Sequence, residues 1–185
     1  VIGVHHACTA CAPAGETARE RWGIGSDLSG EERVNAMSVK TGQCMCGAVQ
    51  LTARNVPTTF GQCLCDMCKR WTGSFFMGVS VAPEDLEITG ADAITTIQSS
   101  DWAERAFCNK CGSSLWYHVT EGPYAAKLSL GVGVLNETDD MVPVREFYSD
   151  KRTCAYQPNN DIEKFTEAQV RAMFAAPDAP TDTKG

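Results

Sequence analysis

The residues of this chain with the most chemical potential are its cysteines, ten among 185 residues. Seven of them form three tight clusters: a C-x-C pair at 44 and 46, a C-x-C-x2-C group at 63, 65 and 68, and a C-x2-C pair at 108 and 111. Closely spaced thiolates are typical ligands of zinc, which takes four protein ligands in a structural site and three in a catalytic one. Seven ligands divide into four and three, so the sequence predicts one closed metal site and one open site.

A glycine directly follows two of these clusters, as Cys46-Gly47 and Cys111-Gly112. Glycine at this place lets the backbone adopt a positive φ and turn its N–H groups toward the sulfurs, the local geometry of closed zinc sites. We therefore predict that these two clusters together hold a structural zinc and join distant parts of the chain. Its four ligands are Cys44, Cys46, Cys108 and Cys111.

The middle cluster, formed by Cys63, Cys65 and Cys68, has no such glycine. Three thiolates from one short loop cover one face of a zinc ion and leave a coordination position for an exchangeable ligand. One interpretation of this cluster is an open site, whose metal could ionise a bound thiol and make it a nucleophile. The alternative is a second closed site that Cys154 or a distant carboxylate completes.

Composition and charge narrow the classes of function. The formal net charge is −7 and the isoelectric point is about 4.9, which disfavours binding to nucleic acid phosphates. No apolar run has the length of a membrane span, and no leader with a charged and then apolar segment opens the sequence. We expect a cytoplasmic protein whose cysteines bind metal instead of forming disulfides. The sequence does not reveal the oligomeric state.

Three segments differ in pattern. Residues 1–36 show neither alternation nor a helical stripe, and we interpret them as an N-terminal extension that is disordered or non-native. An alternative is a small metal site of their own, formed by His5, His6, Cys8 and Cys11. Residues 37–175 carry the patterned, zinc-binding domain, and residues 176–185 form a frayed polar tail.

The patterned domain predicts a mainly β fold. Short β-rich runs alternate with Gly, Pro and Asp breaks. We expect strands at 49–54, 74–81, 86–89, 93–98, 113–119, 124–132 and 146–149. A single short helix is expected at 166–175, where Thr166 and Gln169 can form a capping box.

Several residues near the clusters allow both a functional and a purely structural interpretation. Lys69 and Arg70 could meet a substrate carboxylate, or they could be solvated surface charges. Three aromatic residues could line a pocket or pack in the core: Trp71, Phe75 and Phe76. His118 falls within a strand pattern, and we expect a hydrogen-bonded strand residue instead of a ligand.

The cysteine clusters also lie within longer motifs. These motifs are Gly42-Gln43-Cys44-Met45-Cys46-Gly47, Cys63-Leu64-Cys65-Asp66-Met67-Cys68 with Gly73, Arg105-Ala106-Phe107-Cys108-Asn109-Lys110-Cys111-Gly112-Ser113, and the stretches 131–136 and 143–156. In these residues the chain resembles the glutathione-dependent formaldehyde-activating enzyme family, which includes the centromere protein V domain. The resemblance covers residues 38–170, and seven cysteines in matching order and spacing make it specific.

The resemblance implies a β-tent zinc-binding fold with two zinc ions per chain. It implies a structural zinc on Cys44, Cys46, Cys108 and Cys111 and a catalytic zinc on Cys63, Cys65 and Cys68. It also implies that the thiol of glutathione binds the second zinc and adds to formaldehyde, giving S-(hydroxymethyl)glutathione. We therefore expect a carbon–sulfur lyase that acts on a small thiol and an aldehyde. A non-catalytic zinc module for thiol or protein binding is the alternative.

Overall fold

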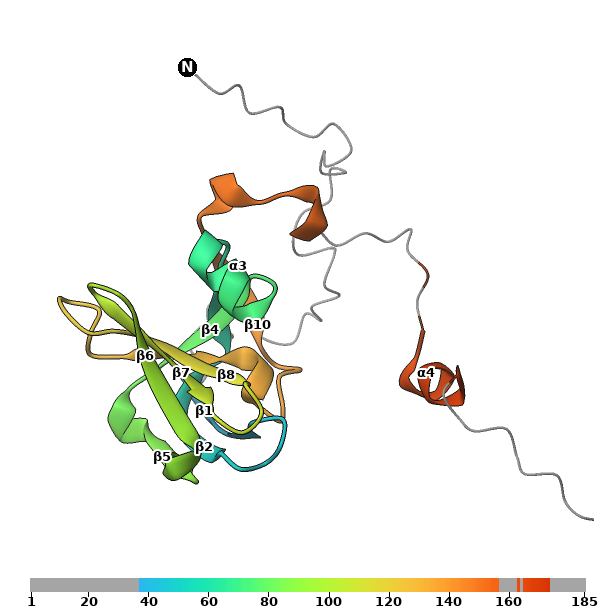
Figure 1. Cartoon of the computed structure of the whole chain (residues 1–185), viewed down its shortest axis with the longest axis horizontal. Helices are drawn as coiled ribbons and strands as arrows, with labels where there is room; N and C mark the ends of the chain where they lie inside the picture. Colours follow the sequence, from blue (N-terminus) through green and yellow to red (C-terminus); the bar gives the residue numbers. More distant parts are fainter. Residues whose placement is uncertain (1–36, 157–162, 164, 174–185) are drawn as a thin grey trace, which may run out of the picture.

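The computed structural model describes residues 37–156, 163 and 165–173, and the side chain of Cys154 lies outside this description. Within these ranges the protein is mainly β, as the sequence predicts (Figure 1). The strands are β1 (Met37–Gln43), β2 (Gln50–Pro57), β3 (Thr59–Cys63), β4 (Phe76–Val81), β5 (Leu86–Thr89), β6 (Ile94–Ser100), β7 (Ala103–Cys108), β8 (Ser114–Val119), β9 (Leu128–Gly131) and β10 (Val142–Phe147). The helices are α3 (Asp66–Thr72) and α4 (Glu167–Met173), with 3₁₀ turns η2 (Pro83–Asp85), η3 (Ala91–Ala93), η4 (Val132–Val134), η5 (Ser149–Lys151) and η6 (Cys154–Tyr156).

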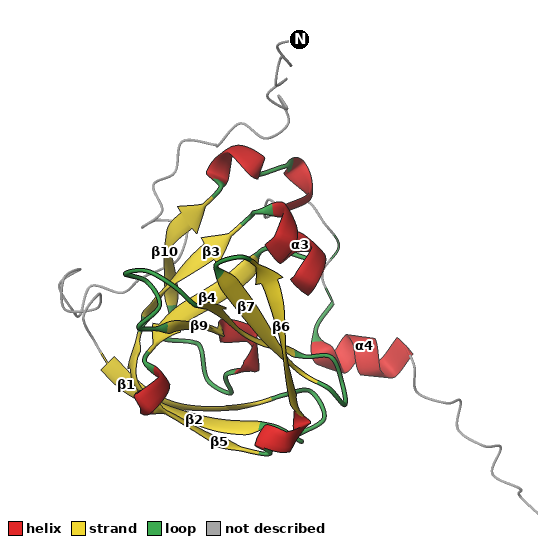
Figure 2. Cartoon of the chain, turned by 60° about the vertical axis from the view of Figure 1, so that its left-hand side comes forward, coloured by secondary structure: helices red, strands yellow, loops and turns green. Residues whose placement is uncertain are grey.

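The strands form two sheets. The smaller sheet has the order β1-β2-β5 and is antiparallel throughout. The larger sheet has the order β10-β3-β4-β9-β8-β7-β6. Strand β10 runs parallel to β3, and all the remaining neighbouring pairs are antiparallel. Figure 2 shows the small sheet lying across the lower side of the molecule, beneath the strands of the larger sheet.

The core lies between the two sheets because each sheet turns one apolar face inward. In β2, Leu51 and Ala53 are buried while Arg54 is exposed, which is the alternation of a strand with one face in the core. The buried cluster draws on both sheets and includes Val49, Leu51, Ala53, Val56, Val79, Val81, Ala106, Leu115, Leu128 and Leu130. Two cysteines, Cys44 and Cys108, belong to the same cluster. The four-cysteine site therefore lies where the sheets meet.

Most of the predicted strands are present, some with different ends. The strand expected at 86–89 matches β5, and the runs at 49–54, 74–81, 93–98, 113–119 and 124–132 match β2, β4, β6, β8 and β9 with shifted ends. The run at 146–149 overlaps the end of β10, which begins earlier. The sequence missed β1, β3, β7 and the helix α3.

The C-terminal helix α4 is present at Glu167–Met173, within the predicted range. The predicted capping box is confirmed: the backbone N–H of Thr166 donates to Gln169 Oε1 at 2.8 Å, and the N–H of Gln169 donates to Thr166 Oγ1 at 3.3 Å. In both views α4 stands apart from the β sheets (Figures 1 and 2), and none of its residues is buried. Neither described helix has the length and hydrophobicity to cross a membrane.

The proposed extension at 1–36 and the tail at 176–185 lie outside the described residues, as does the alternative metal site at His5, His6, Cys8 and Cys11.

Candidate metal centres

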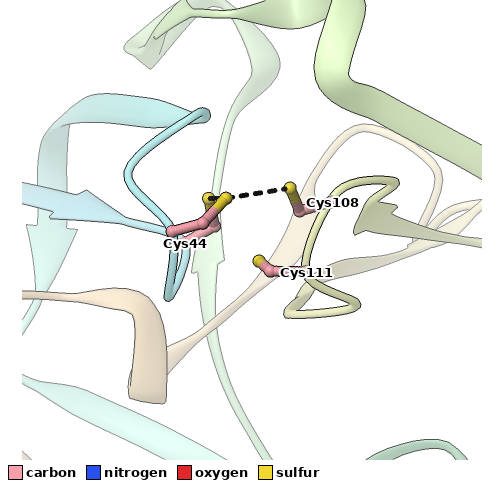
Figure 3. A group of neighbouring side chains, drawn as sticks. Cys44, Cys108 and Cys111 are labelled. Carbon is pink, nitrogen blue, oxygen red and sulfur yellow. Dashed lines mark hydrogen bonds between the residues drawn. The ribbon is translucent and has the colours of Figure 1, made fainter.

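The first cluster brings together Cys44, Cys46, Cys108 and Cys111, the four cysteines that the sequence paired. Cys44 and Cys46 lie in the turn between β1 and β2, while Cys108 ends β7 and Cys111 lies in the turn before β8. Figure 3 shows the side chains of Cys108 and Cys111 facing Cys44 across the space between the two turns. The four Sγ atoms all lie within 4.8 Å of one another.

The spacing of these sulfurs fits a tetrahedral zinc site. Zinc–sulfur bonds of about 2.3 Å place the sulfurs of a tetrahedron about 3.8 Å apart. The Sγ atoms of Cys44 and Cys46 are 3.5 Å apart, and those of Cys46 and Cys108 are 3.9 Å apart. A disulfide needs about 2.05 Å between its sulfurs, and these cysteines are free. The cluster can therefore hold a metal ion, and its thiol donors suit zinc.

Glycine shapes both turns of this four-cysteine site. Gly47 has φ +74° and Gly112 has φ +77°, as the sequence predicts, and such angles strain any residue with a Cβ. Each glycine N–H donates to a carbonyl, that of Cys44 or Cys108, and so closes its turn. The N–H groups that reach sulfur come from following residues, as when Val49 N–H donates to Cys44 Sγ at 3.3 Å.

Ser113 links the two turns. Its Oγ accepts the N–H of Met45 at 3.0 Å, which leaves its hydroxyl hydrogen free to donate to Cys111 Sγ at 3.3 Å. The Ser113 side chain thereby contacts both the turn between β1 and β2 and the sulfur of Cys111. The sequence analysis missed this residue, although its position directly after Cys111-Gly112 was a usable signal.

Hydrogen bonding favours the thiolate at Cys111 and Cys44 and opposes it at Cys46. The Ser113 hydroxyl, together with the Ser113 backbone, lowers the pKa of the Cys111 thiol to about 5. Burial opposes ionisation of Cys44, but the Val49 N–H and the neighbouring thiols outweigh it and lower the pKa. For Cys46, the Ala48 N–H favours the thiolate, yet the bonds with Cys44 and the other thiols prevail and raise the pKa to about 11.

The second cluster consists of Cys63, Cys65 and Cys68, as predicted, and its three sulfurs lie within 4.8 Å of one another. Cys63 ends β3, Cys65 is the N-cap of α3, and Cys68 lies in the first turn of that helix. The Cys65 sulfur accepts the N–H of Cys68 at 3.4 Å, so the ligand spacing and the helix cap depend on each other. Cys63 and Cys65 are half-buried and Cys68 is buried.

Backbone and ion-pair contacts hold this loop against β10 and η5. Leu64 is fully buried, and its N–H donates to the Phe147 carbonyl at 3.0 Å. Asp66, in the first turn of α3, pairs with Lys151 at 2.8 Å and with Lys69 at 3.1 Å. The Lys151 ammonium, then the Lys69 ammonium, hold the pKa of the Asp66 carboxyl at about 2. The loop is thus held at Leu64 and Asp66, the two residues on either side of Cys65.

Two thiols of this cluster influence each other's pKa. The hydrogen bond with Cys68 lowers the pKa of the Cys63 thiol to about 6, and Arg105 adds to this effect. The same bond raises the pKa of Cys68, because that thiol becomes the donor beside a thiolate. Hydrogen bonding within the cluster thus favours the thiolate at Cys63 over that at Cys68.

No fourth ligand joins the three-cysteine cluster within the described residues. Neither a histidine nor a carboxylate of these ranges groups with its sulfurs. A distant carboxylate was one of the two alternatives for a closed site, and the described residues do not provide it. The other, Cys154, has its side chain outside the description. The described part of the site therefore offers three sulfurs, two of them on half-buried residues.

The structure shows the contacts of the charged and aromatic residues for which the sequence allowed two interpretations. Arg70 is exposed, and Lys69 pairs with Asp66 and lies over the Tyr156 ring at 5.8 Å. Phe76 is buried, and Trp71 packs on it with 5.2 Å between ring centroids. These contacts are packing and ion pairing.

Two further residues have partners that the structure defines. His118 is a hydrogen-bonded strand residue, as expected, with Nδ1 3.1 Å from Glu104 Oε1 and Nε2 2.9 Å from the Ala125 carbonyl oxygen. The sequence analysis missed the role of Arg105, whose guanidinium lies 3.6 Å from the sulfur of Cys68.

Comparison with known proteins places these clusters in a family. The family model described as "Glutathione-dependent formaldehyde-activating enzyme" matches residues 39–151, which include all seven clustered cysteines. An uncharacterised lyase of Schizosaccharomyces pombe is 31% identical over 131 residues, which are 70% of this chain and 92% of that protein. A Halomonas elongata protein named "Putative glutathione-dependent formaldehyde-activating enzyme" is 30% identical over 83 residues, 40% of this chain and 53% of that protein.

A crystal structure of a Rhodobacter sphaeroides protein aligns with 57% of this chain and 98% of its own, at 24% identity and a TM-score of 0.47. The family match extends from β1 to η5 and so covers both cysteine clusters and both sheets. On this match and the likeness to the yeast lyase, the chain belongs to the glutathione-dependent formaldehyde-activating enzyme family.

Proposed function

We propose that this protein is a zinc-dependent carbon–sulfur lyase that joins a small thiol, such as glutathione, to an aldehyde, such as formaldehyde. The observation that carries the proposal is the division of seven cysteines into one group of four and one of three, in a member of this family. A purely structural zinc protein has no need of a second cluster with three ligands. The names of the two relatives support the same class of activity.

The two sites have different roles in this proposal. Cys44, Cys46, Cys108 and Cys111 hold a structural zinc at the junction of the sheets. The other three cysteines, Cys63, Cys65 and Cys68, hold a catalytic zinc. A zinc ion bound by three thiolates favours the ionised form of a thiol that joins it, and so supplies a thiolate nucleophile near neutral pH.

The reaction is an addition without change of oxidation state. The thiol sulfur forms a bond to the carbonyl carbon, the carbon–oxygen π bond breaks, and the thiol proton ends on the oxygen. The product is a hemithioacetal, which is an S-hydroxymethyl group when the aldehyde is formaldehyde. The reverse reaction cleaves the same carbon–sulfur bond. For this chemistry Cys63 and Cys65 are the more accessible ligands, since both are half-buried, while Cys68 is buried in α3.

The environment of the chain agrees with a small-molecule substrate. A net charge of −7 disfavours nucleic acid as a partner. A reducing compartment, such as the cytoplasm, would keep the seven clustered thiols free to bind metal.

Cobalt substitution tests the proposal, because the visible spectrum of bound cobalt reports its ligands. We expect glutathione to change the spectrum of the wild-type protein loaded with two cobalt ions, and formaldehyde to be converted to the adduct faster with enzyme than without. In the Cys65→Ser variant, the bands of the four-cysteine site should remain and the response to glutathione should be lost.

Two results would contradict parts of the proposal. If no small thiol changes the wild-type spectrum, thiol activation is wrong. If thiols bind but adduct formation is not accelerated, the protein is a thiol-binding zinc module, which is the alternative function.

A further inference from the structure

Arg105 is a charged residue buried next to the three-cysteine site. Its side chain belongs to β7, and the residue is 3% exposed. A buried guanidinium is unfavourable unless hydrogen bonds and an opposite charge compensate for the lost water. Across the described ranges, no carboxylate lies within ion-pair distance of Arg105.

The group that compensates for the burial of the Arg105 guanidinium is therefore the sulfur of Cys68. Its Nη1 donates to the Ser99 hydroxyl of β6, which is neutral, and its Nη2 lies 3.6 Å from Cys68 Sγ. Among the described residues that touch this guanidinium, Cys68 is the one that belongs to a metal-binding cluster, where a cysteine ligand is a thiolate. The opposite charge for Arg105 thus comes from the metal-binding cluster itself.

The guanidinium is also held in one orientation. The Trp71 ring of α3 has its centroid 5.3 Å from Arg105 Cζ, and the Tyr117 ring of β8 has its centroid 5.0 Å away. With the bond to Ser99, three elements fix a planar group whose donors have a rigid geometry. Arg105 Nε has no hydrogen-bond partner among the described residues, so the Nη atoms carry the directed contacts.

We propose that Arg105 is a positioning residue and the built-in counter-charge of the three-cysteine site. This inference rests on the proposed function. Three thiolates and a zinc ion carry a net charge of −1, and a substrate thiolate brings the total to −2. A fixed cation 3.6 Å from one sulfur offsets this charge in surroundings that screen poorly. The substrate class that benefits is a small thiol that binds in its anionic form.

Three substitutions separate charge from hydrogen bonding. Arg105→Lys keeps the positive charge but loses the rigid fork. Arg105→Gln keeps a donor without the charge, and Arg105→Met keeps neither. Arg145→Met is the matched control. It removes the same positive charge, but from an exposed position on β10, where the charge is solvated.

The readout is the dissociation constant of glutathione, taken from the cobalt spectrum, together with the number of metal ions per chain. We expect Arg105→Gln and Arg105→Met to weaken glutathione binding about tenfold or more, in keeping with the loss of a charge-assisted contact. Arg105→Lys should stay within about threefold of wild type and should shift the sulfur-to-cobalt bands, since the directed bond to Cys68 is lost. Arg145→Met should match wild type in both measurements.

The outcomes distinguish this inference from the proposed function. If wild-type protein holds no second metal or shows no response to thiols, the proposed function fails. If wild type responds and the Lys and Gln variants bind glutathione equally, the counter-charge is wrong while the proposed function stands. If both neutral variants fail to fold with metal present, Arg105 serves the core instead of the site, and the inference is overturned as well.

Discussion

The sulfurs of the two clusters have different surroundings, and this difference decides what the loss of one cysteine does. Cys108 is fully buried and belongs to the core where the sheets meet. Cys65 is half-buried in the cap of a short helix at the surface. Removing a ligand from the core site should therefore affect the fold, and removing one from the other site should affect only the local loop.

We predict that Cys108→Ser leaves the chain unfolded, whereas Cys65→Ser loses one metal and keeps the fold. The reason is that a structural zinc contributes about 10 kcal/mol or more, as much as the whole stability of a typical domain. Zinc content per chain and thermal melting followed by circular dichroism check both variants. A wild-type protein with a single metal under reducing, metal-replete conditions would contradict the assignment, as would equal melting temperatures for the two variants.

The cysteines could be assigned from the sequence because their spacing is itself the signal. Two ligands on one tight turn need a fixed separation, and Gly47 and Gly112 mark the turns. The partners that donate to the sulfurs or hold them were harder to predict. Ser113 and Arg105 act through a neighbouring turn or a helix across the molecule, and such contacts depend on strand pairing that no local pattern reveals.

The elements themselves show where local patterns are informative. Strands with one buried face, such as β2, alternate clearly, and they were found. Helix α3 has only seven residues and was missed, because a helix of this length is stabilised by its cap and its tertiary contacts more than by its own sequence. Strand β7 was missed because two successive buried residues, Arg105 and Ala106, break its alternation.

The hairpin of β7 and β8 contains a pH-dependent contact at His118. Both partners of its ring, the Glu104 carboxylate and the Ala125 carbonyl, are acceptors, so only the doubly protonated ring satisfies both. The Ala125 carbonyl, together with Glu104, accordingly raises the pKa of His118 above its usual 6.5. A raised pKa means that the contact stabilises the fold fully below pH 6.5 and that this contribution is lost as the pH rises through the folded-state value.

We predict that His118→Gln lowers the free energy of unfolding by about 1 kcal/mol at pH 6 and by less at pH 8.5. Denaturant titrations of wild type and variant at the two pH values measure the difference, with zinc content checked in each sample. Titration of the ring proton resonances that the variant lacks should give a pKa above 6.5. A midpoint below that value, or an equal loss of stability at both pH values, would refute the ion pair.

The arrangement of the whole molecule depends on contacts between residues far apart in sequence. Strand β10 pairs in parallel with β3, and the four-cysteine site joins the β1–β2 turn to the end of β7. Patterns of alternation indicate that strands exist but not which of them are neighbours. The cysteine pairing was the one long-range link that the sequence offered, and it correctly placed the two turns together.

We predict that a chain beginning at Met37 keeps its melting temperature and its zinc content. The first strand starts at Met37, the family match begins at residue 39, and both clusters lie within the domain that follows. Zinc analysis and a thermal melt of the shortened and the full chain make the comparison. A clear decrease in either quantity would show that residues 1–36 contribute to the domain or bind metal through His5, His6, Cys8 and Cys11.

Strand β7 takes part in the surroundings of both cysteine clusters. Arg105 contacts the three-cysteine cluster, while Cys108, three positions later, belongs to the other. Because side chains alternate along a strand, an odd separation directs these two residues to opposite faces, and a shift of one residue in pairing would misplace both. Metal loading of the four-cysteine cluster should therefore report whether β7 has paired in the correct register, since a slipped strand would separate Cys108 from the other three cysteines.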